Sequence, residues 1–568
     1  MDARLIAPGV VMMTACLLAQ LPGDRPAPNA RATRSVVMAR RGMIATSQPL
    51  ASAAGLQVLR EGGNAADAAV AAAAVLSVVE PTMNGIGGDL FAIVYDAKTK
   101  RLTGLNASGR AGRAATPEEF RRRNVSRIPE RGVLAITVPG VVDGWSELLA
   151  RHGTIQLGRA LRPAIEYARD GFPVPEIIAT MWKDNEDDLR VDPAAARTFL
   201  PGGRAPATGE VFRNPKLAAT LEQIASGGRD AFYRGPVAAA MAADLRRREG
   251  LLDERDFADH RSDWVEPVST RYRGYDVFEL GLNTQGFVAL EMLNILEGYD
   301  LAALGHNSAA CLHLLVEANR IAFADRRAYL ADADVVPAAV QAMLISKEYA
   351  ARRRKEISRD RAASSYAPGR PEGGPEPAPA SVDVTGTGDT IYLTVADAQG
   401  NVVSLIQSLY DAFGSGIVAG DTGVALQNRG ALFTLQAGHP NLVAPRKRPF
   451  HTLVPAMVMK DGRPWLSFGV MGGDMQPQGH VQVLLNLIDF GMNVQEAGEA
   501  ARYRLAGSNV ALESAIGAET RAALEKLGHK VTSGFGMWGG FQGILIDPKS
   551  GVLMGGSDPR KDGLAIGF

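Results

Sequence analysis

The pattern of apolar and polar positions changes character near residue 390. Residues 139–355 are mostly helical in pattern, with one strand-like insert at residues 271–280. After residue 390, short apolar stretches rich in β-branched residues alternate with turns that contain Asp and Gly, which is typical of antiparallel hairpins. The sequence therefore predicts a helical first part and a second part built from strands. The helices expected in the first part include residues 217–224, 237–248 and 309–330.

Both parts contribute to the predicted sheets. The first part supplies an apolar strand at residues 90–95, and the second part adds helices at residues 481–490 and 494–502. Stacked hairpins flanked by helices favour an α+β fold with four layers, helix–sheet–sheet–helix (αββα). The strands expected in the second part are residues 391–396, 402–410, 423–427, 456–460, 465–470, 543–547 and 552–554.

Two glycine-containing segments occur before residue 100. Asn64 follows Gly62-Gly63 and is the expected N-cap of an alanine-rich run at residues 65–79, whose small side chains on every face predict a buried helix. A second cluster, Gly85–Asp89, lies between that helix and the strand at residues 90–95. A dinucleotide-binding fingerprint has the opposite order, strand then helix, so nucleotide binding is excluded.

Thr390 stands at the sharpest change in composition. Residues 362–388 are crowded with Pro, Gly, Ser and Ala, and an apolar strand begins immediately after them. A self-cleaving enzyme needs such a junction, because a flexible side can be released while a rigid side holds the new N-terminus. A freed N-terminal Thr carries a nucleophilic hydroxyl and its own base, the α-amine. The alternative is a Thr at the start of a strand after a surface linker.

Composition excludes several classes of function. The chain has 568 residues, is 46% apolar and 21% charged, and has a formal net charge of zero. This composition is typical of a soluble globular protein, and nothing favours nucleic acid or an anionic membrane as a partner. Two cysteines exclude a disulfide framework and a thiolate cluster, and the eight histidines show no zinc-like spacing. We therefore expect neither a metal nor another cofactor.

Residues 1–34 differ from the rest of the chain. A short apolar run at residues 10–21 has the length of a secretory signal rather than of a membrane span. The segment is therefore either an export signal, which predicts a periplasmic or exported protein, or a disordered leader on a cytoplasmic one. No other run approaches a membrane-spanning helix, and we expect no stable span.

Six short motifs occur along the chain in a fixed order. They are Gly62–Ala68, Gly85–Asp89, Asp230–Tyr233, Leu293–Glu297, Phe413–Ile417 and Met471–Gly473. Together with the Thr390 junction they resemble the γ-glutamyltransferases of the N-terminal-nucleophile hydrolases, over residues 36–568. The resemblance implies a precursor cut between Asp389 and Thr390 into a large subunit (35–389, with a flexible tail at 362–388) and a small catalytic subunit (390–568). The two subunits would remain together as a heterodimer.

The resemblance also implies roles for individual residues. Thr390 would attack the amide of a small molecule or peptide, with the hydroxyl of Ser408 beside it. The backbone N–H groups of Gly472 and Gly473 would stabilise the developing oxyanion. Arg110 would bind a carboxylate of the substrate, because its planar guanidinium matches two carboxylate oxygens. The alternatives are an ordinary glycine turn and a surface arginine.

This sequence departs from the family pattern around the acyl-binding positions. Tyr410 replaces an Asn, and His451-Thr452 replaces a pair of serines. Arg429 and Leu432 take the places of the Gln and Asp that bind the glutamyl amine. An α-ammonium facing these two would lack a partner, and loss of a buried charge partner costs about 3–5 kcal/mol. Ile391-Tyr392 replaces the usual Thr or Ser followed by His.

These departures predict an acidic acyl group without the amine, bound by Arg110 and Arg429 together. Relatives with such preferences include oxamate amidohydrolases and cephalosporin acylases. The alternative is that Asp474, directly after the glycine pair, supplies the missing acid.

The loop at residues 432–449 is short, which predicts a site without a lid and hydrolysis rather than transfer. Two other functions stay open. One is an authentic glutathione hydrolase or γ-glutamyltransferase, and the other is a binding protein that never matures.

Overall fold

The computed structural model describes residues 32–370, 377, 389–534, 536 and 538–568. The expected leader, except for its last three residues, and most of the tail before Thr390 lie outside this range. No helix in the described part of the chain is both long enough and apolar enough to cross a membrane.

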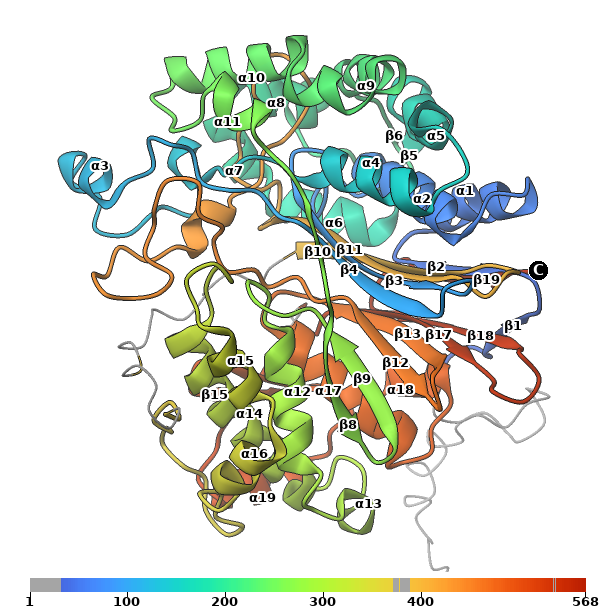
Figure 1. Cartoon of the computed structure of the whole chain (residues 1–568), viewed down its shortest axis with the longest axis vertical. Helices are drawn as coiled ribbons and strands as arrows, with labels where there is room; N and C mark the ends of the chain where they lie inside the picture. Colours follow the sequence, from blue (N-terminus) through green and yellow to red (C-terminus); the bar gives the residue numbers. More distant parts are fainter. Residues whose placement is uncertain (1–31, 371–376, 378–388, 535, 537) are drawn as a thin grey trace, which may run out of the picture.

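Two seven-stranded sheets form the centre of the molecule (Figure 1). All neighbouring strands within each of these two sheets are antiparallel. The first sheet runs in the order β19 (Leu564–Gly567), β2 (Met43–Thr46), β10 (Asp389–Ala396), β11 (Val402–Tyr410), β3 (Asp89–Asp96), β4 (Arg101–Ala107) and β7 (Asp263–Val265). The second runs in the order β1 (Val37–Ala39), β18 (Leu553–Ser557), β17 (Gly540–Ile546), β13 (Arg463–Met471), β12 (Ala456–Lys460), β9 (Tyr275–Glu279) and β8 (Val268–Tyr272).

Strands from both sides of residue 390 alternate within these sheets. In the first sheet, β10 and β11 lie between β2 and β3, which belong to the N-terminal part. In the second sheet, β12 pairs with β9 of the N-terminal part. Each sheet is therefore completed by both parts of the chain, as the sequence predicted.

Helices cover the outer face of each sheet, which gives the four layers of an αββα sandwich (Figure 1). This confirms the predicted fold class. The layer above the first sheet contains α1 (Pro49–Arg60), α2 (Ala65–Val79), α4 (Val141–His152), α5 (Leu157–Asp170), α9 (Pro215–Tyr233) and α10 (Pro236–Arg247). The layer below the second sheet contains α12 (Gly286–Leu296), α14 (Ala309–Tyr329), α16 (Lys347–Arg354), α17 (Met475–Ile488), α18 (Val494–Glu499) and α19 (Ala518–Lys526).

Helix α2 shows why the alanine-rich run folds as expected. Asn64 caps its start by accepting from the backbone N–H of Asp67, whose side chain in turn accepts from the N–H of Asn64. All of its residues are buried, because alanine lets α1, α5 and the first sheet approach from several sides. The helix therefore lies inside the upper layer rather than on the surface.

Polar side chains fix how the two sheets lie on one another. Thr394 of β10 and Ser467 of β13 are joined by a hydroxyl–hydroxyl hydrogen bond of 2.6 Å. Two residues along, the ring of Tyr392 packs on Gly469, where an added Cβ would come within 2.5 Å of the ring. Only glycine at position 469 allows this approach, so the contact fixes how β10 of the first sheet lies on β13 of the second.

Two elements differ from the sequence prediction. The strand-like insert at residues 271–280 is part of a hairpin, β8 and β9, which extends the second sheet. The segment at residues 423–427 is no strand and forms only isolated bridges. It lies against Gly87, where an added Cβ would meet the carbonyl oxygen of Ala425 at 2.1 Å. The backbone of residues 423–427 is therefore satisfied by contact with the loop around Gly87 and not by a neighbouring strand.

Candidate active site

Thr390 lies at the start of β10, in the middle of the first sheet. It is buried, and its hydroxyl donates a hydrogen bond to Oγ of Ser408 on the adjacent strand β11, at 3.2 Å. The structure therefore places these two hydroxyl residues side by side, although 18 positions separate them in the sequence.

The pairing of β10 with β11 is irregular at this point. Asp389 pairs with Tyr410 and Ile391 with Gln407, so Thr390 faces two residues of β11 instead of one. Tyr410 adopts a φ of +86°, which is rare for a residue other than glycine. A bulge of this kind bends the strand and redirects side chains, and here it coincides with the expected cleavage point.

The hydroxyl oxygen of Ser408 accepts several hydrogen bonds. The backbone N–H of Tyr410 donates to it at 2.7 Å and Nη2 of Arg429 at 2.9 Å, in addition to the longer contact with Thr390. Because a hydroxyl oxygen has two lone pairs, the two shorter bonds occupy its acceptor capacity. Ser408 is therefore poorly suited to take a proton from Thr390.

Arg429 is completely buried next to this hydroxyl pair. Its Nη1 donates to Oγ1 of Thr452 at 2.8 Å, and its guanidinium lies 4.8 Å from the centre of the Tyr410 ring. Its Nε has no hydrogen-bond partner, and among the described residues no carboxylate lies within ion-pair distance of it. Burial lowers the pKa of Arg429 to about 10, which still leaves it a cation at neutral pH. The site thus contains a buried positive charge without a directly bound anion.

His451 and Asp89 form the next part of this site. Nε2 of His451 lies 3.3 Å from Oδ2 of Asp89, whose other oxygen accepts from the N–H of Gly109 at 2.8 Å. Burial and the nearby charge of Arg429 lower the pKa of His451 to about 4, so the imidazole is neutral at pH 7. Asp89 pairs with Ser408 in the sheet, so its charge lies close enough to offset part of that of Arg429.

Gly472 and Gly473 form the turn between β13 and α17. Both have positive φ, 116° and 56°, and a Cβ at Gly472 would approach the backbone of Gly539 to 3.0 Å. Among the described residues, none accepts a hydrogen bond from the N–H of either glycine. The cross-sheet contacts step by two residues, from Thr394 with Ser467 to Tyr392 with Gly469. We infer from this step that Thr390 lies beside the end of β13.

Gln285 connects the glycine turn to the arginine. Its Nε2 donates to the carbonyl oxygens of Thr452, at 2.9 Å, and of Gly473, at 3.0 Å. Through Thr452 this network reaches Arg429 and then Ser408. The predicted residues Thr390, Ser408, Tyr410, Arg429, His451, Thr452 and Gly473 therefore belong to one contiguous site, and Gly472 adjoins it.

Asp474, the alternative acid beside the glycine pair, already has a cationic partner. Arg326 of α14 binds it with both terminal nitrogens, at 2.6 and 2.9 Å, and also donates to Oε1 of Gln285. The carboxylate is therefore neutralised by a neighbouring guanidinium before any substrate arrives.

Arg110 belongs to an adjoining cluster rather than to the Arg429 network. It lies 3.2 Å from Asp263 and 3.8 Å from Asp332, and Arg448 shares Asp263 with it. Burial and the charge of Arg448 lower the pKa of Arg110. Both carboxylates neutralise this pair of arginines, so the sequence prediction that Arg110 and Arg429 form one binding site has no direct contact to support it.

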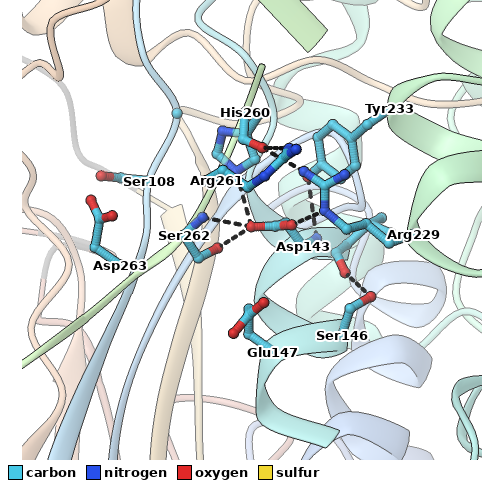
Figure 2. A network of polar contacts seen from close by, with 12 residues as sticks. Ser108, Asp143, Ser146, Glu147, Arg229, Tyr233, His260, Arg261, Ser262 and Asp263 are labelled. Carbon is cyan, nitrogen blue, oxygen red and sulfur yellow. Dashed lines mark hydrogen bonds and ion pairs between the residues drawn. The ribbon is translucent and has the colours of Figure 1, made fainter. Parts of the chain in front are cut away.

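Asp143 on α4 holds the segment that supplies Asp263 (Figure 2). It accepts from the N–H and the hydroxyl of Ser262, both at 2.6 Å, and from Arg229. Tyr233, which ends the motif Asp230–Tyr233, belongs to the same network. Its hydroxyl donates a hydrogen bond to the carbonyl oxygen of Pro139 at 2.7 Å. This buried network fixes where β7 begins.

Several residues of the site were not predicted as such. Asp89 ends the glycine motif Gly85–Asp89, so a signal for it was present in the sequence. Gln285 and Arg326 lie in segments whose sequence carries no comparable pattern. Their side chains reach the site only because α12 and α14 pack beneath the second sheet.

A comparison with known families decides the assignment. A sequence profile described as gamma-glutamyltranspeptidase matches residues 51–568. The chain belongs to this family. It is accordingly an N-terminal-nucleophile enzyme of the amidohydrolase and acyltransferase type, as the sequence analysis predicted.

Individual relatives cover almost the whole chain. A glutathione hydrolase-like YwrD proenzyme of Bacillus subtilis (strain 168) is 40% identical, over 94% of this chain and 99% of its own length. An oxamate amidohydrolase proenzyme of Klebsiella pneumoniae is 36% identical, over 93% and 98%. The crystal structure of a cephalosporin acylase from Bacillus halodurans is similar with a TM-score of 0.88 and 41% identity, over 97% and 99%.

Proposed function

We propose that Thr390 is the nucleophile of an autoprocessing amidohydrolase that prefers an acidic acyl group without an α-amine. In the first step the Thr390 hydroxyl attacks the carbonyl carbon of residue 389, and the peptide bond becomes an ester as the nitrogen leaves. Water then hydrolyses this ester. The products are a carboxylate at residue 389 and a free α-amine on Thr390.

The free amine then serves as the base during turnover. Its reference pKa of about 7.7–8.0 leaves part of it unprotonated near neutral pH. Ser408 cannot take this role, because Tyr410 and Arg429 already donate to its oxygen. The hydroxyl of Thr390 attacks the substrate amide, the amine of the leaving group departs with a proton, and water later releases the acyl group.

The N–H groups at the end of β13 suit the oxyanion of this reaction. Gly472 and Gly473 leave their N–H groups without acceptors among the described residues, and positive φ at both positions turns the backbone sharply. Backbone N–H groups that stand ready for a developing negative charge are a large source of transition-state stabilisation. We assign this role to the glycine pair.

Arg429 is the observation that supports an acidic acyl group. Its buried guanidinium binds two hydroxyls and a tyrosine ring and no carboxylate, so a substrate carboxylate would supply the missing counter-charge. An α-ammonium at the same place would be repelled. Cleavage would open this side of the site, because Asp389 pairs with Tyr410 and the ring of Tyr410 covers Arg429.

The relatives support the same preference. Cephalosporin acylase and oxamate amidohydrolase are the names of two proteins at 41% and 36% identity. Oxamate carries a carboxylate and no α-amine. Acyl groups of this chemistry would place their carboxylate on Arg429 while their amide carbon reaches Thr390.

A matched set of three anilides tests the proposal. Glutaryl-, γ-glutamyl- and valeryl-p-nitroanilide have acyl chains of the same length and differ in the terminal carboxylate and the α-amine. We expect the highest kcat/KM for the glutaryl compound, by roughly a hundredfold or more if a buried charge pair of about 3 kcal/mol is at stake. Equal or faster turnover of the γ-glutamyl compound would reject the acyl preference while leaving Thr390 as the nucleophile.

A glutathione hydrolase is the second candidate function. The name of the 40% identical relative, glutathione hydrolase-like, favours it. It requires a partner for the α-amine, and Asp474 could serve only by sharing its charge with Arg326. The anilide comparison distinguishes the two functions directly.

We also propose that hydrolysis exceeds transfer. The loop at residues 432–449 bonds back to Ala111 through the N–H of Arg446, at 3.0 Å, and the carbonyl oxygen of Lys447, at 2.8 Å. A loop held along the protein in this way would not close over the acyl-enzyme, so water could reach it. Transfer to a dipeptide acceptor that outpaces hydrolysis at modest acceptor concentration would contradict this.

A further inference from the structure

Two histidines and a glutamate converge in the lower helical layer. His313 and Glu317 lie one turn apart on α14, a spacing that places both side chains on one face of the helix. His529 reaches them from the segment between α19 and β16 (Lys530–Ser533), 216 positions further along the chain than His313. One ligand atom of each residue lies within 4.8 Å of the other two, and all three residues are buried.

The hydrogen bonds of His313 fix which of its nitrogens carries a lone pair. Its Nε2 lies 2.7 Å from the carbonyl oxygen of Ser358. A carbonyl only accepts, so Nε2 carries the proton of the neutral ring. The lone pair is therefore on Nδ1, which lies 2.8 Å from Nε2 of His529. This Nδ1 therefore accepts a hydrogen bond from the Nε2–H of His529. A histidine that donates one ring N–H to a backbone carbonyl and presents the other nitrogen as an acceptor has the arrangement found in metal ligands.

His529 and Glu317 also have unused acceptor atoms. Nδ1 of His529 is buried and has no hydrogen-bond partner, and Oε1 of Glu317 accepts no hydrogen bond, although Arg320 Nε lies 3.4 Å from it. The other oxygen, Oε2, accepts from the Tyr366 hydroxyl at 2.6 Å and from the Ala363 N–H at 3.0 Å.

We propose that His313, His529 and Glu317 bind one divalent transition-metal ion of the zinc class. Two neutral imidazoles and one carboxylate are a donor set that Zn²⁺ prefers, with metal–nitrogen distances of about 2.0–2.1 Å. The ion would bind Nδ1 of His313 and Nε2 of His529, and the proton of Nε2 would move to the unpartnered Nδ1 of the same ring. In a tetrahedral site the two nitrogens would be roughly 3.3 Å apart, so the rings must separate by about half an ångström.

A cavity beside the cluster offers a route for the ion and a place for water as a fourth ligand. It has a volume of about 220 Å³, and His313 lines it together with Tyr299, Leu314 and Arg359. The sequence itself predicts no metal, because the histidines lack zinc-like spacing. The spacing gave no signal because the fold, rather than a local motif, brings His529 to α14.

The ligands come from both sides of the Thr390 junction. His313 and Glu317 precede it and His529 follows it, and the residues that orient them, Ser358 and Ala363, lie near the end of the N-terminal part. The N–H of Ala362 also donates to the carbonyl oxygen of Leu527 at 2.7 Å. A bound ion would therefore tie the end of the large subunit to the small subunit. Metal binding itself does not depend on the proposed amide hydrolysis.

Cobalt substitution tests the site in the full-length protein after removal of any affinity tag. The protein is first treated with a chelator, and Co²⁺ is then titrated while visible absorption is recorded. We expect saturation at one equivalent with the intense bands of tetrahedral Co²⁺, and displacement of the cobalt by Zn²⁺. His529→Gln and Glu317→Gln should each weaken binding by at least about a hundredfold, because loss of an outer partner alone costs up to that much.

His152→Gln is the matched control, since His152 packs on Trp264 in the opposite helical layer and should leave cobalt binding unchanged. Thermal unfolding gives a second measurement, because an ion that binds only the folded protein raises its midpoint. Zn²⁺ should raise the midpoint of the chelated wild type and not that of His529→Gln. No saturable cobalt binding by the wild type, or equal binding by His529→Gln, would overturn the proposal and leave only a hydrogen-bonded cluster.

Discussion

In the part of the chain that the structure describes, two arginines are fully buried, and their surroundings differ in one respect. Arg502 binds Asp558 at 2.8 Å and donates to the carbonyl oxygens of Trp538, at 2.6 Å, and Gly498, at 2.7 Å. Arg429 is equally buried, but its side chain bonds to two hydroxyls and a tyrosine ring and, among the residues that the structure describes, to no carboxylate. Burial lowers the pKa of both to about 10.

We propose that this difference separates a structural charge, Arg502, from one that binds substrate, Arg429. A buried charge with its carboxylate in place contributes to a defined fold, whereas one without it carries an unmet electrostatic demand. Such a demand persists only where the rest of the structure imposes it, which is typical of binding and catalytic sites. Arg429 lies one hydroxyl away from Thr390, so a substrate can meet this demand at the point of reaction.

The largest effect is expected from removal of the Thr390 hydroxyl, next to which Arg429 would bind the substrate. Thr390→Ala should block self-cleavage and all amide turnover, because no other group replaces the attacking oxygen. On a denaturing gel the variant should give one band at 60.2 kDa. The wild type should give two, of roughly 41 and roughly 19 kDa by share of the chain, with Thr390 as the new N-terminus.

Thr394→Ala is the matched control, because Thr394 lies on the same strand and bonds to Ser467. It should still cleave at residue 390. Cleavage at that bond in Thr390→Ala would show that the nucleophile is a different residue.

Replacing the structural arginine should affect stability most. Arg502→Met leaves Asp558 with Arg560 as its remaining cation, 3.0 Å away, and removes the bonds to two buried carbonyls. We expect the free energy of unfolding to fall by about 3–5 kcal/mol, measured by urea denaturation. A loss below about 1 kcal/mol would mean that the carboxylate partner is not what distinguishes the two arginines.

Replacing the functional arginine should give the opposite pattern. Arg429→Met removes two hydrogen bonds to hydroxyls and leaves no carboxylate directly unpaired, so we expect a loss of only about 1–2 kcal/mol in unfolding free energy. The kcat/KM for glutaryl-p-nitroanilide should fall by roughly a hundredfold, while that for the valeryl compound changes little. Equal losses on both substrates would show that Arg429 holds the site together rather than binding the acyl carboxylate.

The smallest expected effect is on the pH dependence of stability. His451 has a folded-state pKa of about 4, below its unfolded value of about 6.5, so the unfolded state takes up its proton first as the pH falls. Its contribution is complete above pH 6.5 and is lost between pH 6.5 and 4, by up to about 3 kcal/mol. Between pH 4 and 6.5 the free energy of unfolding should depend less steeply on pH for His451→Gln than for the wild type, as measured from unfolding curves at several pH values. An unchanged slope would mean that His451 is charged beside Asp89.

Sequence patterns predicted the layers of the fold better than its connections. The α2 helix, β11 and β12 have the bounds that the apolar patterns indicated. The hairpin of β8 and β9 was not recognised, because its turn lies inside a region of helical character. Residues 362–370, counted with the flexible tail, are anchored in the structure, for example by Gly369 N–H to Asp325 at 2.6 Å. Several of their partners, such as Glu317 and Asp325, lie on α14, whereas Ala362 bonds to Leu527 in the C-terminal part. Composition alone cannot show such contacts.

The same holds for the site. The resemblance to the family brought together Thr390, Ser408 and Arg429, and the structure places them in contact. The charge balance could not be predicted, because it depends on which carboxylates already have partners. Asp474 is bound by Arg326, and Arg110 is bound by Asp263. Arg110 is therefore less able than Arg429 to bind a substrate carboxylate.

The alternation of strands has a consequence for the protein after the proposed cleavage before Thr390. Because β10 and β11 lie between β2 and β3, neither fragment contains a complete sheet by itself. Cleavage of one peptide bond between these interleaved strands should change the chemistry of Thr390 without loosening the packing of the sheets. Two separately synthesised halves, by contrast, would each expose open sheet edges and would have to find one another before either could fold.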